Sequence, residues 1–252
     1  MNISLALSGG AARGAFHLGV LDKFDEVGVK VHALSGASVG SFIAVAYSSG
    51  FLPREILNII KSKEFKSIFS INFTLKSLVK MDTNSKVIQN FIKFSDLSQL
   101  PIPVVISASD LNTKEAIYFA SGDIAKIVLG SCAIVPVFGP VEYEGYLLAD
   151  GCFVDNLPAS SLEKFKFPIV AVDLQPITQI EKVGILSSTK RALEVALTPS
   201  VKQLKADTIY ITDQNLAKYS IFSFKKFDEM FEMGRAAVSS EILRNIENAK
   251  CI

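Results

Sequence analysis

Residues 31–46 read VHALSGASVGSFIAVA and predict a strand, a sharp turn and a helix in that order. Val31 to Leu34 is a short apolar run typical of a buried strand, and the residues after Gly40 continue as an apolar helix. A strand-to-helix turn can hold a serine side chain exposed, and only small residues fit beside the serine. This serine turn, residues 36–40, therefore predicts Ser38 as a nucleophile, with Gly36 and Gly40 shaping the turn.

A second strand, small-residue loop and helix precede the serine turn. Ile3 to Leu7 predicts a buried strand, residues 8–14 (SGGAARG) form the glycine loop, and Arg13 to Glu26 has helical spacing. The backbone N–H groups of such a loop can converge on one oxyanion. A phosphate-binding loop is the alternative, but Ala11 stands where the dinucleotide fingerprint has glycine, and the Gly-Lys-Ser/Thr of a P-loop is absent.

The histidines limit the type of hydrolase. His17 and His32 are the only two, and both precede Ser38, so the order Ser, Asp/Glu, His of an α/β-hydrolase triad is unavailable. Isolated histidines near apolar residues more often have a structural role than a catalytic one. We therefore expect a carboxylate to be the base.

Asp150 is the best candidate for this carboxylate. A turn at residues 144–145 and a strand at residues 146–149 lead into it, and Gly151 permits tight backbone geometry beside it. Burial would raise the pKa of an aspartate from its ordinary value of about 3.9 toward that of a useful base. Other aspartates have the same chemistry and can equally be cap or turn residues, and spacing alone does not rank them. These rivals are Asp110, Asp155 and Asp173.

The rest of the chain alternates between strand and helix patterns. Strands are predicted at 104–108, 116–119, 169–173 and 208–212, and helices near 53–62, 83–93, 122–130 and 188–197. Residues 225–248 give the longest pattern, which we interpret as one helix packed on the core. Alternation of this kind implies an α/β fold with a mostly parallel sheet and helices on both faces. No repeat or linker divides the chain, so we predict one domain over residues 1–252.

Composition excludes some classes of function. The 252 residues are 49% hydrophobic, enough for a large core, and 26 basic against 25 acidic residues leave a net charge of +1, which argues against nucleic-acid binding. Three cysteines and two histidines lack metal-ligand spacing, so no metal or organic cofactor is expected. The first residues lack the pattern of a secretory signal and no segment has the length of a membrane span, so we expect a cytoplasmic protein with reduced thiols.

Two stretches combine lysines with aromatic residues, at 61–80 and at 219–227. Such a composition suits peripheral contact with an anionic bilayer on the inner face of the membrane. The alternative is a lid whose phenylalanines are buried, and we favour it for 61–80 because phenylalanine usually lies in a core.

Taken in order, the glycine loop, the serine turn and Asp150-Gly151 resemble the three signature motifs of patatin-like phospholipases. The similarity covers roughly residues 3–170 and includes the connecting segments ASDLNT (108–113), SCAI (131–134) and DNLP (155–158). It implies a patatin-like three-layer α/β fold, in which residues 171–252 complete the sheet and add a C-terminal helix. It also implies a dyad of Ser38 and Asp150 supported by Gly151, and an oxyanion hole in the glycine loop at Gly9, Gly10, Ala11, Ala12, Arg13 and Gly14.

Two positions depart from the family pattern. Ala11 replaces the third glycine of the loop, and if its φ is positive the alanine costs about 1 kcal/mol or distorts the oxyanion hole. Cys152 follows Asp150-Gly151 where alanine or glycine is usual. The resemblance implies a serine acyl hydrolase that cleaves lipid esters, of the phospholipase A or lysophospholipase type. The alternatives are an esterase or acyltransferase on soluble esters or thioesters, and a non-catalytic lipid-binding regulatory protein.

Overall fold

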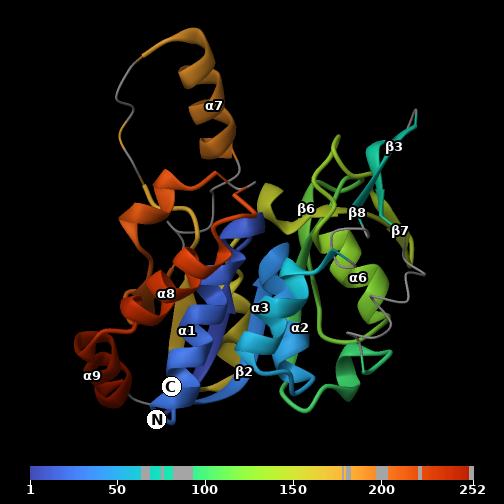
Figure 1. The fold of residues 1–252 in the computed structure, drawn as a ribbon. Coiled ribbons are helices and arrows are strands. Elements are labelled where there is room, and N and C mark those ends of the chain that lie inside the picture. The colour runs from blue at the N-terminus through green and yellow to red at the C-terminus, as the bar shows by residue number, and fades with distance from the viewer. Residues whose placement is uncertain are drawn as a thin grey trace.

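A mixed β-sheet forms the centre of the computed structural model (Figure 1). The structure describes residues 1–63, 69–74, 77–81, 93–177, 179, 183–196, 204–220 and 223–249. Followed from one hydrogen-bonded neighbour to the next, the sheet connects β10-β9-β1-β2-β5-β8-β7, and β6 also pairs with β5. Of the helix predicted near 83–93, residues 83–92 lie outside the described residues, as do the side chains of the lysine-rich stretch from residue 64 onward.

Most strand pairs in the sheet are parallel, so the predicted α/β class is confirmed. The parallel strands are β1 (Asn2–Leu7), β2 (Lys30–Ala37), β5 (Val104–Asp110), β9 (Ile169–Val172) and β10 (Ile209–Ile211). The antiparallel pairs involve β6 (Glu115–Phe119), β7 (Val141–Tyr143) and β8 (Tyr146–Asp150). A separate hairpin joins β3 (Phe69–Thr74) to β4 (Ser77–Met81). The carboxyl ends of the parallel strands lie at one edge, where both predicted loops follow their strands.

The two faces of the sheet are covered unequally. Ile3, Leu5 and Leu7 of β1 point into the larger core, whereas Ala6 belongs to a smaller cluster on the other face. The larger core contains residues from α1 (Ala15–Glu26), α2 (Val39–Ser48), α3 (Pro53–Lys61), α6 (Ile124–Ser131) and α8 (Phe227–Ala237). The smaller cluster is covered by η4 (Ala159–Phe165), a 3-10 helix. Small side chains on this face let the short helix approach the strands closely.

The prediction of one helix over 225–248 is wrong. The structure has two helices there, α8 and α9 (Ser240–Asn248), which are separated at Val238 and Ser239. The Ser239 Oγ accepts a hydrogen bond from the Ile242 N–H at 3.2 Å, so it caps a new helix. The apolar spacing continues through the break, which is why periodicity alone predicted an uninterrupted helix.

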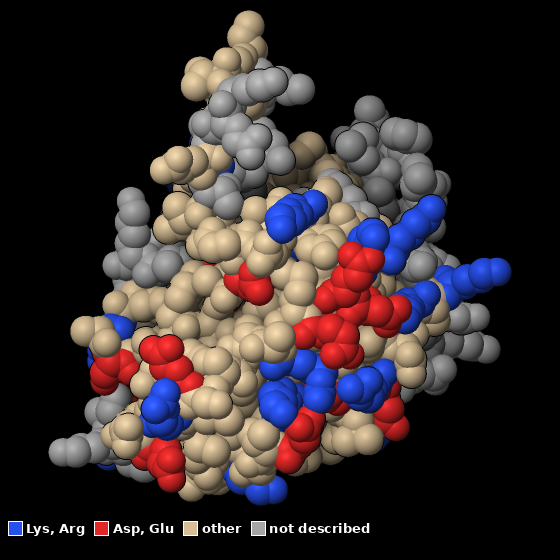
Figure 2. Space-filling model, turned by 60° about the vertical axis from the view of Figure 1, so that its left-hand side comes forward, with Lys and Arg blue, Asp and Glu red and all other residues tan. Residues whose placement is uncertain are grey.

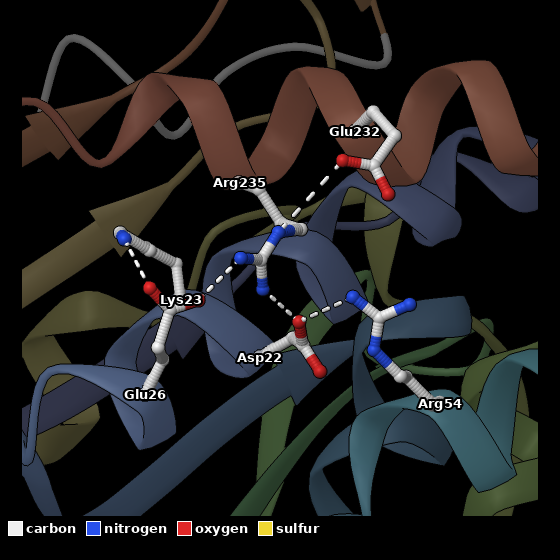
Figure 3. Close-up of polar contacts among 6 residues, drawn as sticks. All are labelled: Asp22, Lys23, Glu26, Arg54, Glu232 and Arg235. Atoms are coloured by element: carbon white, nitrogen blue, oxygen red, sulfur yellow. Dashed lines mark hydrogen bonds and ion pairs between the residues drawn. The ribbon is translucent and has the colours of Figure 1, made fainter.

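Ion pairs fix α8 and α3 against α1 (Figure 3). Arg235 of α8 pairs with Asp22 and Glu26 of α1. Arg54 of α3 also pairs with Asp22, at 3.1 Å, and its guanidinium lies over the Phe231 ring of α8. On the face drawn in Figure 2, acidic and basic side chains are mixed, in agreement with the nearly balanced charge of the chain.

Helix α7 (Ile185–Ala196) stands away from the sheet (Figure 1). The side chain of Ile185 is 93% exposed, and Val183 just before the helix is also exposed. None of the helices in the described ranges combines the length and the apolar composition that a bilayer crossing requires.

Candidate active site

Ser38 and Asp150 meet because two strands end at neighbouring positions along one edge of β5. β2 runs parallel to β5, and its last residue in this pairing, Ala37, pairs with Ser107. β8 runs antiparallel to β5, and its last residue, Asp150, pairs with Ala108, the residue after Ser107. β6 occupies the other edge of β5 over the same residues, so β2 and β8 must share an edge. The chain turns away at Ser38, and Asp150 fills the next position.

The serine turn has the backbone that its glycines predict. Ser38 has φ 51° and ψ −126°, a conformation that L-residues rarely adopt, and α2 begins at the next residue. A Cβ on Gly36 would lie 2.5 Å from the Gly40 carbonyl, and a Cβ on Gly40 would lie 2.3 Å from the Leu7 oxygen. Both positions therefore exclude any side chain, and the turn packs directly on the end of β1.

Three hydroxyl groups meet at the Ser38 residue. The Ser38 Oγ donates a hydrogen bond to Asp150 Oδ2 at 2.7 Å. The Ser38 N–H donates to Ser131 Oγ at 2.9 Å, and Ser131 Oγ in turn donates to the Ser107 carbonyl at 2.7 Å. The Ser41 Oγ donates to the Ser38 carbonyl at 2.6 Å. The strained backbone of the turn is thus held on its N–H side and on its carbonyl side.

Asp150 is fully buried, and burial raises the pKa of its carboxyl to about 6, opposed by the hydrogen bonds that it accepts. Its second oxygen, Oδ1, accepts the backbone N–H of Cys152 at 2.9 Å. The departure at Cys152 leaves this bond unaffected, because a backbone group donates it. Gly151 lies against the Ser107 carbonyl, where a Cβ would approach to 2.5 Å. Hydrogen bonds therefore orient both oxygens of this carboxylate, and its pKa lies closer to neutral than that of an ordinary aspartate.

The other aspartates and the two histidines have different surroundings. Asp110 accepts the Leu147 N–H, which lowers its pKa, and Asp155 and Asp173 accept the hydroxyls of Tyr118 and Tyr210. His17 is buried in α1, and its Nε2–H donates to the Ser8 carbonyl at 2.8 Å. His32 stacks on Phe167. The geometry therefore favours Asp150 over its rivals.

The glycine loop lies directly beside Ser38, since a Cβ on Gly9 would be 3.0 Å from the Ser38 Cβ. The Gly9 N–H is already bound by Asn156, to its Oδ1 at 3.1 Å and its carbonyl at 3.2 Å, and the Arg13 N–H donates to the Gly10 carbonyl. In the described part of the chain, the N–H groups of Gly10, Ala11 and Ala12 have no acceptor. Of the six predicted oxyanion positions, Gly9 and Arg13 thus have occupied N–H groups, whereas Gly10, Ala11 and Ala12 have available donors. Gly14 instead packs on Val39 at the start of α2.

Ala11 has the positive φ that its position in the motif suggested. Its φ is 48°, at the first residue of η1 (Ala11–Gly14). An alanine in this region costs about 1 kcal/mol relative to glycine, so the loop carries strain that the usual third glycine would avoid.

Sequence reasoning assigned no role to Ser131 and Asn156. Both lie in segments that resemble the family, but nothing in their spacing predicts that one binds the Ser38 N–H and the other the Gly9 N–H. Their only sequence signal was membership of these segments.

We expect Ser131→Ala to lower kcat about 10-fold to 100-fold with little change in KM. The substitution leaves the Ser38 N–H without its acceptor in a buried site and frees a strained turn, and a misplaced nucleophile loses rate steeply. Steady-state kinetics on one acyl ester measure the effect. Ser188→Ala, at an exposed serine of α7, is the matched control. Wild-type kcat in Ser131→Ala would show that the turn needs no such support.

The protein is thus an α/β protein that carries a serine turn, a buried aspartate and a small-residue loop at one edge of its sheet. The family model described as patatin-like phospholipase matches residues 5–162, and the chain therefore belongs to that family.

Relatives of known sequence agree with this membership, and a solved structure shares the fold. An uncharacterized NTE family protein of Mycobacterium bovis is 28% identical over 163 residues, covering 64% of this chain and 45% of the relative. Lysophospholipase NTE1 of Candida albicans is 22% identical over 266 residues, covering 92% of this chain and 19% of the relative. The chain thus spans about half of the first and a fifth of the second. The crystal structure of VipD from Legionella pneumophila shares the fold, with a TM-score of 0.53 and 13% identity over 92% of this chain and 67% of that one.

Proposed function

We propose that this protein is a serine acyl hydrolase that cleaves lipid esters of the lysophospholipid class. The hydrogen bond of 2.7 Å between Ser38 Oγ and the buried Asp150 carboxylate carries the proposal. A serine hydroxyl is a weak nucleophile until a neighbouring base accepts its proton, and this pair has the required distance and direction. The family and the name of the fungal relative support the choice of a lipid substrate.

In the proposed reaction, Asp150 accepts the Ser38 proton as Ser38 Oγ attacks the ester carbonyl carbon. The carbonyl oxygen becomes an oxyanion, and the N–H groups of Gly10, Ala11 and Ala12 are the donors available to it. The positive end of α2 adds to this stabilisation. Collapse of the tetrahedral intermediate expels the alcohol, which takes the proton from Asp150. Water activated by the same carboxylate then hydrolyses the acyl-enzyme.

Incubation of the purified chain with a fluorophosphonate probe and, separately, with a lysophospholipid tests this proposal. We expect one labelled peptide that contains Ser38, and release of free fatty acid detected by mass spectrometry. A short soluble ester and an acyl thioester with an alcohol acceptor serve as parallel substrates. Labelling with hydrolysis of the soluble ester alone would replace the lipid by a soluble substrate. Absence of labelling and turnover would favour a non-catalytic lipid-binding protein.

A further inference from the structure

The Arg13 side chain connects the glycine loop to two distant segments of the chain. Its Nε and Nη2 donate to the Tyr219 carbonyl at 2.9 Å and 2.7 Å, and its Nη1 donates to the Leu174 carbonyl at 2.9 Å. Leu174 follows the carboxyl end of β9, and Tyr219 precedes α8. Both acceptors lie beyond residue 162, where the match to the family model ends. The signature loop is therefore tied to chain outside the signature region.

Further bonds strengthen the same connection. The Leu174 N–H donates to Ser8 Oγ at 2.9 Å, so Leu174 holds the glycine loop through its N–H and its carbonyl. The Tyr219 hydroxyl donates to Glu229 of α8 at 3.1 Å. α8 is in turn paired with α1 through Arg235. A displacement of the segment at Tyr219 would thus be transmitted to Arg13 and the loop.

We propose that Arg13 is a positioning residue, whose guanidinium fixes the N–H groups of Gly10, Ala11 and Ala12 beside Ser38. The proposal rests on the oxyanion role given to these groups above. A guanidinium presents its donors in a rigid planar fork, so it can bind two carbonyls at once, whereas a lysine ammonium acts as a point charge on a flexible stem. The competing role for a cation beside a lipase serine is recognition of a phosphate headgroup. Here three donor contacts of the guanidinium are directed at main-chain carbonyls.

Arg13→Lys separates the two roles when it is assayed on a lysophospholipid and on a monoacylglycerol with the same acyl chain. For a positioning residue, kcat falls about 100-fold on both substrates with KM nearly unchanged, because the lost geometry is common to both reactions. The rate of fluorophosphonate labelling of Ser38 falls with it. Arg54→Lys, at an arginine of α3 that pairs with Asp22, is the matched control and keeps wild-type rates.

Two results would overturn the assignment. If KM rises on the lysophospholipid alone, Arg13 is a headgroup-binding residue. If kcat is unchanged on both substrates, the contacts of Arg13 with the two carbonyls do not affect the reaction. If Arg13→Lys does not fold, Arg13→Gln, whose amide N–H replaces only the donor at the Nε position, undergoes the same comparison. Failure of the proposed function is distinct, because the wild type itself would then show neither labelling nor turnover.

Discussion

Replacing Ser38 with alanine is expected to reduce ester hydrolysis by about 10⁴-fold or more, the scale seen when a serine nucleophile is removed from a hydrolase. The hydroxyls nearest to it already have partners and cannot take its place. Ser131 Oγ donates to the Ser107 carbonyl, and Ser41 Oγ donates to the Ser38 carbonyl. Kinetics with a chromogenic acyl ester measure the loss, and fluorophosphonate labelling disappears in parallel.

The fold of this variant should survive, because its backbone bonds to Ser131 and Ser41 do not use the Ser38 side chain. Thermal unfolding of Ser38→Ala and Ser188→Ala should therefore take place near the wild-type temperature. Substantial turnover by a folded Ser38→Ala protein would remove Ser38 from the reaction and, with it, the mechanism proposed here.

The serine turn and the glycine loop were predictable because their constraints are local. A strand that ends in small residues before an apolar helix forces a tight turn, and the clashes at Gly36 and Gly40 are the physical form of that requirement. The predicted strands before both loops and the α/β class are confirmed for the same reason. The single-domain organisation and the catalytic roles remain predictions.

Contacts made by residues far apart in the chain could not be predicted in this way. The meeting of Ser38 and Asp150 depends on the register of β2 and β8 along β5, which no local pattern encodes. The Arg13 side chain binds carbonyls at positions 174 and 219, and a main-chain acceptor gives no signal in the sequence. The division of 225–248 was missed because a serine cap interrupts a helix without changing its apolar spacing.

Asp150→Asn is expected to lower kcat by about 10³-fold, within the usual contribution of a general base, because an amide cannot accept the Ser38 proton. The asparagine keeps the shape of the site. Its oxygen can still accept the Cys152 N–H, and its NH₂ can donate to Ser38 Oγ in place of the present bond. Kinetics and thermal unfolding on the same preparation measure the loss of rate and the retention of the fold.

The activity of the wild-type protein should depend on pH through the ionisation of Asp150. In its proposed role as the base, Asp150 would act only when ionised, and burial raises its pKa from 3.8 to about 6, so kcat/KM should fall about tenfold per unit of pH below 6. The raised pKa also means that the fold favours the protonated form. The stability from this group is therefore fully present below pH 3.8 and is lost as pH rises through 6. Asp150→Asn, which carries no charge, should unfold at a higher temperature than wild type at pH 8, and the difference should shrink toward pH 4. If Asp150→Asn loses activity but does not unfold at a higher temperature than wild type at pH 8, the ionised Asp150 carboxylate does not destabilise the folded protein.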